Sequence, residues 1–131
     1  MASYKVVMAN GVFDLFHIGH LRYLEAAAAM GDVLAVTVTK DAFVNKGAGR
    51  PVYDENERIA LVDAVRFVHY ALLVNGCIDG LQRVRPNIFV KGREYEGKIE
   101  REHEEYCKAH NIEIRFTDTE TVRPRARLGQ G

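Results

Sequence analysis

The sequence lacks an excess of charge of either sign. Its 131 residues include 18 Lys and Arg and 18 Asp and Glu, so the formal net charge is zero. A dedicated nucleic-acid-binding protein normally carries a basic excess, so we expect no nucleic acid as a partner. No apolar run approaches the roughly 20 residues of a membrane span, and the first residues lack the charged and apolar regions of a signal peptide. These absences predict a cytoplasmic protein that does not bind a membrane.

Cysteine is scarce as well. Cys77 and Cys107 have no metal-binding or redox spacing and are too few for a disulfide framework. No internal repeat and no low-complexity segment is visible. The length suits one domain, and a chain of this size buries roughly two thirds of its unfolded surface, which is enough for a core without covalent cross-links.

The sequence does contain an alternation of short apolar segments and helical patterns. The apolar segments, rich in β-branched residues, are predicted strands at 4–9, 33–39, 68–74, 87–90 and 112–116. The segments with helical periodicity are predicted helices at 19–30, 54–66, 79–84 and 98–110. Gly31 stands where glycine commonly ends a helix. Strands alternating with helices predict an α/β fold, a doubly wound parallel sheet with helices on both faces.

In such a sheet, ligands bind beyond the carboxyl ends of the strands. The segment after the first strand reads N-G-V-F-D-L-F-H-I-G-H and places His17 and His20 three apart at the start of a helix. A helix N-terminus attracts phosphate, and Gly11 and Gly19 let a ligand approach the backbone. Two imidazoles there can stabilise charge that develops in a transition state. Two alternatives stay open: ordinary polar residues, one of them a helix cap, or a zinc site that needs a third protein ligand.

This block resembles the signature of the nucleotidyltransferase superfamily, which includes cytidylyltransferases and adenylyltransferases. Gly49-Arg50-Pro51-Val52 and Phe89-Val90-Lys91-Gly92 resemble the nucleotidyltransferase domain of bacterial ADP-heptose synthesis enzymes, whereas Tyr95-Glu96-Gly97-Lys98 is similar to glycerol-3-phosphate cytidylyltransferases. The resemblance implies a Rossmann-like fold of five parallel strands. It also implies transfer of AMP or CMP from a nucleoside triphosphate to the phosphate of a small sugar or polyol phosphate, with release of pyrophosphate.

Roles for individual residues follow from the resemblance. His17, His20 and Lys46 are the expected catalytic residues, and Mg²⁺ is expected to accompany the triphosphate. Contacts with the nucleotide are expected from Gly11, Val12, Phe13, Asp14, Gly19, Lys91, Gly92, Glu94 and Thr121. Contacts with the substrate are expected from Arg58, Arg66 and Tyr95. Asp14 is alternatively a structural turn residue, and the two arginines are alternatively solvated charges or ion-pair partners.

The sequence departs from the family after the fifth predicted strand. Relatives carry there a Ser/Thr-rich turn that opens a final helix, and Thr121 matches only its first hydroxyl position. Pro124 disfavours a helical conformation at Arg123. We therefore expect a nucleotidyltransferase domain over residues 1–122 and a disordered, truncated or artificially added tail over 123–131.

Several alternatives remain open at this point. The chain could be a non-catalytic nucleotide-binding module of the same fold. It could also be a fragment of an aminoacyl-tRNA synthetase, because His17-Ile18-Gly19-His20 matches the signature of that family as well. Those synthetases are far longer and carry a lysine-rich second motif that this chain does not show. Lys91-Gly92 favours ATP, whereas residues 95–98 favour CTP and hence a glycerol-3-phosphate cytidylyltransferase. The resemblance also implies a possible homodimer.

Overall fold

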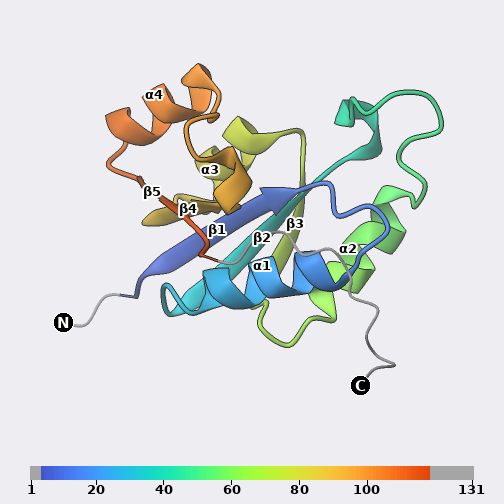
Figure 1. The fold of residues 1–131 in the computed structure, drawn as a ribbon, viewed down its shortest axis with the longest axis horizontal. Helices are drawn as coiled ribbons and strands as arrows, with labels where there is room; N and C mark the ends of the chain where they lie inside the picture. The colour runs from blue at the N-terminus through green and yellow to red at the C-terminus, as the bar shows by residue number, and fades with distance from the viewer. Residues whose placement is uncertain (1–3, 119–131) are drawn as a thin grey trace.

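The computed structural model describes residues 4–118, which form a five-stranded parallel sheet with helices on both of its faces (Figure 1). The strands are β1 (Val6–Gly11), β2 (Val33–Thr39), β3 (Tyr70–Val74), β4 (Ile88–Lys91) and β5 (Glu113–Phe116), and they lie in the order β3-β2-β1-β4-β5. The helices are α1 (Ile18–Ala28), α2 (Glu55–Asp63), α3 (Cys77–Val84) and α4 (Arg101–Ala109), with short 3-10 turns η1 (Asp41–Phe43) and η2 (Arg93–Tyr95). The predicted fold class is confirmed.

Two hydrophobic cores lie on opposite faces of the sheet, because side chains alternate along each strand. Val7 and Ala9 of β1 face the larger core, which α1 closes with Leu24 and α2 with Val62. Met8 faces the other core, which contains residues of α3 and α4. In Figure 1, α1 and α2 accordingly lie on one side of the sheet and α3 and α4 on the other.

Gly31 does not have the conformation that the sequence predicts for it. Helix α1 closes at Ala29 in the right-handed region, and Gly31 is not among the glycines with positive φ. A Cβ atom on Gly31 would instead lie 2.6 Å from Cγ2 of Val7 and 2.8 Å from the carbonyl oxygen of Lys5. Glycine is therefore needed because the turn approaches the start of β1 closely.

The helix predicted over residues 54–66 is shorter in the structure, where α2 ends at Asp63. Val65 still packs against the larger core from the turn that follows. Its apolar side chain continues the helical spacing beyond the last helical residue, which is why the pattern overestimates the length.

The order of the strands places a topological switch point beside β1. This strand pairs with β2 on one side and with β4 on the other, so the loops after β1 and β4 diverge to opposite faces and leave a crevice. No helix among residues 4–118 is long and apolar enough to cross a membrane. The predicted domain boundary at residue 122 and the predicted contact of Thr121 lie outside the described residues.

Candidate functional site

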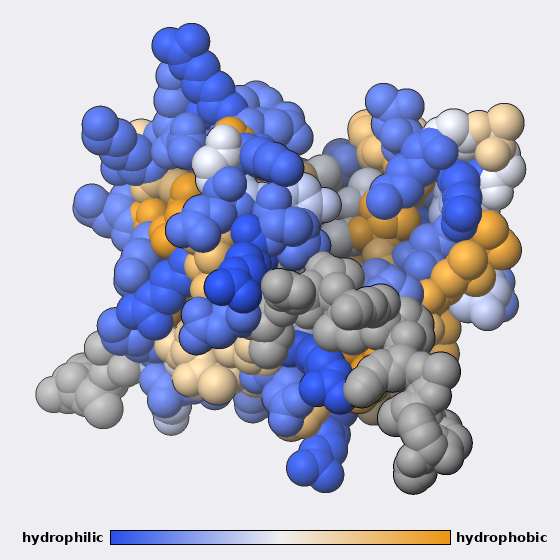
Figure 2. Space-filling view, viewed as in Figure 1, coloured by the Kyte–Doolittle hydropathy of each residue, from blue (hydrophilic) through white to orange (hydrophobic). Residues whose placement is uncertain are grey.

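A cavity of about 640 Å³ opens at the carboxyl ends of the central strands. Figure 2 shows the surface hollowed between the part that carries α4 and the part that carries the loop after β2. The structure brings most of the predicted site residues to the wall of this cavity, namely Gly11, Val12, Phe13, Asp14, His17, Gly19, His20, Lys46, Lys91, Gly92, Glu94 and Tyr95. A cavity of this size can hold a nucleotide-sized ligand.

Sequence reasoning missed five lining residues: Asn10, Tyr23, Thr39, Arg50 and Thr117. Asn10 and Thr39 lie in the last residues of β1 and β2, so the rule that ligands bind at the carboxyl ends of strands could have identified them. Tyr23 lies inside α1, where its spacing resembles that of a core residue. Its hydroxyl donates a hydrogen bond to the carbonyl of Val90.

The two histidines cap α1 reciprocally. His17 is the N-cap residue, and its Nδ1 accepts a hydrogen bond from the backbone N–H of Gly19 at 3.0 Å. Nδ1 of His20 accepts from the backbone N–H of His17 at 3.1 Å, and the two rings stack with centroids 4.0 Å apart. An imidazole nitrogen that accepts from an N–H carries no proton, so each neutral ring carries its proton on Nε2.

His20 is neutral at physiological pH. Burial lowers its pKa to about 4, and the nearby positive charges of His17 and Lys46 act in the same direction. The ring therefore presents an uncharged Nε2–H donor at the N-terminus of α1. Such a donor suits an oxygen that gains negative charge during a reaction.

Phe13 supports His20 from the loop after β1. Its φ of 56° and that of Leu15, 52°, lie in the left-handed region that non-glycine residues rarely adopt. The buried Phe13 ring stands edge-on to the His20 ring at 5.4 Å. It also packs on Gly11, where a Cβ would lie 3.0 Å from the ring. The absence of a side chain at Gly11 therefore makes room for Phe13.

Asp14 fastens the loop after β1 to the loop after β2. Its carboxylate accepts hydrogen bonds from the backbone N–H groups of Val52 at 2.8 Å and Tyr53 at 2.9 Å, and it contacts Arg50 at 3.3 Å. Burial raises the pKa of Asp14, but these hydrogen bonds outweigh it and hold that pKa below its usual value. The structure supports the structural alternative for Asp14, although the residue also lines the cavity.

Cationic side chains line the cavity from two directions. Lys46 is exposed on the loop after β2. Lys91 is half-buried at the end of β4, with Nζ 4.3 Å from the centroid of the Tyr95 ring. Burial lowers the pKa of Lys91. Neighbouring groups, including Glu94, act in the opposite direction, but the pKa stays below its usual value. The Glu94 carboxylate folds over Gly92, where a Cβ would lie 2.6 Å from Oε1.

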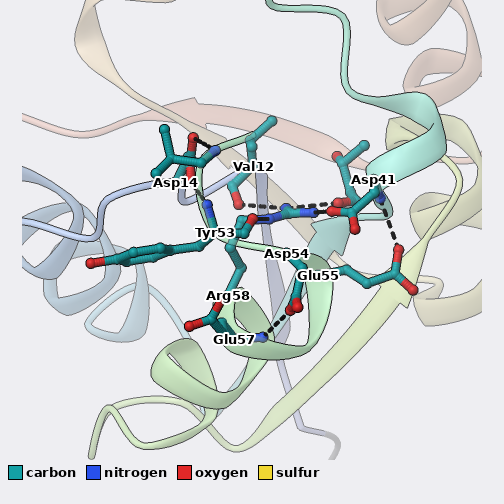
Figure 3. A network of polar contacts seen from close by, with 10 residues as sticks. Val12, Asp14, Asp41, Tyr53, Asp54, Glu55, Glu57 and Arg58 are labelled. Carbon is teal, nitrogen blue, oxygen red and sulfur yellow. Dashed lines mark hydrogen bonds and ion pairs between the residues drawn. The ribbon is translucent and has the colours of Figure 1, made fainter. Parts of the chain in front are cut away.

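The expected substrate contacts of Arg58 and Arg66 are not supported. Neither residue lines the cavity. Arg58 is fully buried among backbone carbonyls (Figure 3), and Arg66 is exposed after α2 with its guanidinium 5.4 Å from the ring centroid of Phe67. The ion-pair alternative holds for Arg58, which pairs with Asp41.

A zinc site at the two histidines would need a third protein ligand. Within residues 4–118, no group of three or more His, Cys, Asp or Glu side chains could hold a metal ion. Both carboxylate oxygens of Asp14 are already hydrogen-bonded to backbone N–H groups.

Comparison with known proteins identifies the kind of domain that carries this cavity. The family profile described as cytidylyltransferase-like matches residues 8–124. The bifunctional protein HldE of Campylobacter curvus is 40% identical over 98 residues, 72% of this chain and 21% of that protein. HldE of Citrifermentans bemidjiense is 38% identical over 121 residues, 87% of this chain and 25% of that protein. The chain thus spans about a fifth to a quarter of the length of these curated relatives.

Solved structures share the fold. A lipopolysaccharide core biosynthesis protein from Thermoplasma volcanium has a TM-score of 0.75 at 30% identity, covering 89% of this chain and 98% of that one. Pantoate-beta-alanine ligase from Francisella tularensis, solved in complex with beta-gamma ATP and beta-alanine, has a TM-score of 0.64 at 14% identity over 92% of this chain and 60% of that one. At that identity the second likeness concerns the fold alone.

Proposed function

The chain belongs to the cytidylyltransferase-like family, and from this premise we propose that it transfers AMP or CMP from a nucleoside triphosphate to the phosphate of a small sugar or polyol phosphate. An oxygen of the acceptor phosphate attacks the α-phosphorus, a new P–O bond forms, and the bond to the leaving pyrophosphate breaks. The observation that carries the proposal is the reciprocal pair of histidines at the N-terminus of α1, inside a cavity with lysines on two sides.

Catalysis in this proposal consists of positioning and charge stabilisation, because no covalent intermediate with the protein is needed. His17 and His20 donate from Nε2 to phosphate oxygens, and the N-terminus of α1 adds its positive dipole. Lys46 and Lys91 add positive charge from the loops after β2 and β4. Mg²⁺ would enter with the triphosphate, held by phosphate oxygens and water, and would neutralise part of its charge.

A second candidate function is a nucleotide-binding module without catalysis. It is favoured by the sequence after β5, where only Thr121 matches the Ser/Thr-rich turn of relatives. Within the enzyme class, a glycerol-3-phosphate cytidylyltransferase is the alternative, because residues 95–98 resemble that group. The resemblance of Gly49-Arg50-Pro51-Val52 and Phe89-Val90-Lys91-Gly92 to ADP-heptose synthesis enzymes supports a sugar phosphate as the acceptor.

The experiment that tests the proposal measures pyrophosphate release from ATP, CTP, GTP and UTP with Mg²⁺ and a panel of sugar phosphates and glycerol 3-phosphate. We expect one triphosphate and one acceptor class to give turnover. The variant His20→Ala should lower kcat by about 10²- to 10³-fold, as expected for loss of one transition-state donor. His110→Ala, at the C-cap of α4 and outside the cavity lining, is the matched control. Binding of triphosphate without pyrophosphate release would favour the binding module.

A further inference from the structure

Arg58 of α2 does not line the cavity. Its guanidinium nevertheless makes four hydrogen bonds to residues of the surrounding loops and of β2 (Figure 3). Nε donates to the carbonyl of Tyr53 at 3.0 Å. One terminal nitrogen donates to the carbonyls of Val12 at 2.9 Å and Thr39 at 2.8 Å, and the other donates to the Asp41 carboxylate at 2.6 Å. The side chain is completely shielded from solvent. Removing a charge from water costs free energy, and hydrogen bonds to its donors must offset this cost.

Three of the four acceptors lie in the two loops that lead to the expected catalytic residues, and the fourth, Thr39, is the last residue of β2. Val12 lies in the loop that leads from β1 to His17. Asp41 and Tyr53 lie at the two ends of the segment that carries Lys46. The planar guanidinium of Arg58 therefore joins the loop after β1, which leads to His17 and His20, to the loop after β2, which carries Lys46 and is called the lysine loop below.

Tyr53 is held from both sides. Its carbonyl accepts from Arg58, and its backbone N–H donates to Asp14 at 2.9 Å. Asp41 is also held twice, because its backbone N–H donates to the Glu55 carboxylate at 2.8 Å while its own carboxylate accepts from Arg58. The ends of the lysine loop are thus fixed to β1's loop and to α2, whereas Lys46 between them is exposed.

We infer that Arg58 is a positioning residue, which holds the loop with His17 and His20 and the loop with Lys46 in the relative placement that the nucleotidyl transfer requires. The inference rests on the proposed function. The guanidinium can do this because its donors form a rigid planar fork pointing in several directions. A lysine ammonium at the same place could satisfy Asp41 or a carbonyl but could not span all four acceptors.

The first test compares steady-state kinetics of Arg58→Lys, Asp41→Asn and the control Arg101→Met. Arg101 pairs with Glu105 on the exposed face of α4, so its replacement removes an arginine and an ion pair far from both loops. Misplacement of catalytic groups costs up to about 100-fold in rate, so we expect kcat of Arg58→Lys to fall about 10- to 100-fold with little change in KM. Asp41→Asn keeps the three carbonyl contacts and should show a smaller fall. Unchanged kcat in a folded Arg58→Lys variant would overturn the inference.

The second test measures the local stability of the two loops and does not depend on enzymatic activity. Amide hydrogen exchange at Val52 and Tyr53, whose N–H groups donate to Asp14, should quicken in Arg58→Lys and stay unchanged in Arg101→Met. Wild-type exchange at both amides in Arg58→Lys would also overturn the inference. If the wild-type chain releases no pyrophosphate with any substrate pair, the proposed function fails, and hydrogen exchange still decides whether Arg58 holds the two loops together. Asp41→Asn replaces Arg58→Lys in both tests if the latter does not fold.

Discussion

At the scale of single residues, the backbone determines the chemistry of the two histidines. Each Nδ1 accepts from an N–H of the first turn of α1, which leaves only Nε2–H for a ligand. Protonation of either ring at Nδ1 would break its cap. The same hydrogen bonds therefore cap the N-terminus of α1 and place the proton of each neutral ring on Nε2.

This arrangement predicts a dependence of stability on pH. The unfolded chain protonates His20 near pH 6.5, whereas the folded protein protonates it only near pH 4. Between these values the unfolded state binds more protons, so the contribution of His20 to stability is lost as the pH falls from about 6.5 toward 4. Urea unfolding at several pH values should show that His20→Gln loses less stability on acidification than the wild type does.

The control for this prediction is His110→Gln, because His110 stacks on Tyr106 on α4, outside the cavity lining. Its stability should follow the pH dependence of the wild type. Parallel curves for wild type and His20→Gln would contradict the prediction.

Only part of this residue chemistry could be predicted from the sequence. The spacing of His17 and His20 indicates a pair at a helix start, but which ring nitrogen faces the backbone depends on rotamers that a sequence does not reveal. The sequence does carry a signal for the buried position of Arg58. It precedes Val62 by four residues, so it lies on the buried face of the helix, where a charged residue calls for buried partners.

At the scale of elements, the strands are easier to predict than the turns between them. The apolar segment at 33–39 coincides with β2, because a strand covered on both faces has β-branched and apolar residues throughout. The polar pattern at 98–110 gives only the shorter α4, Arg101–Ala109, because polar residues suit a loop as well as a solvated helix. The role of Gly31 depends on the distant approach of β1, which no local pattern contains.

The close approach at Gly31 predicts a stability loss on substitution. In Gly31→Ser, the new Cβ would meet Cγ2 of Val7 and the backbone oxygen of Lys5, and the backbone cannot move aside easily. We expect the free energy of unfolding to fall by about 1–3 kcal/mol, the usual cost of overpacking, measured by urea denaturation.

The same substitution at Gly76 is the matched control. Nothing lies within 4 Å of a Cβ at this position, and the residue is the N-cap of α3, where serine is favoured. Gly76→Ser should therefore be neutral or slightly stabilising. Equal changes in the free energy of unfolding at the two glycines would contradict the role assigned to the close approach at Gly31.

At the scale of the whole molecule, a net charge of zero coexists with a site suited to an anion. Lys46, Lys91, Arg50 and the N-terminus of α1 line one cavity, whereas of the acidic residues that the structure describes, Asp14 and Glu94 alone lie in its lining. Of the acidic residues in the lining, Asp14 is paired with Arg50. The zero net charge argues against a dedicated nucleic-acid-binding protein but carries no information on this local concentration of positive charge.

This site predicts stabilisation by nucleoside triphosphates. A ligand that binds only the folded state raises stability by about 2.7 kcal/mol at 100 times its Kd. Thermal unfolding of the full chain with ATP, CTP, GTP or UTP in the presence of Mg²⁺ should show the largest shift for ATP or CTP, and EDTA should reduce it. Equal shifts from all four would contradict recognition of the base.

Strand β1 lies at the centre of the sheet, although it is the first strand of the described chain. Its partner β2 follows within 30 residues, but its other partner, β4, begins only at Ile88. During synthesis, one edge of β1 therefore stays unpaired until β4 has been made, and Met8 lacks the core to which α3 and α4 contribute. An apolar strand edge that stays open until β4 is made is a site where a chaperone would protect the nascent chain against aggregation.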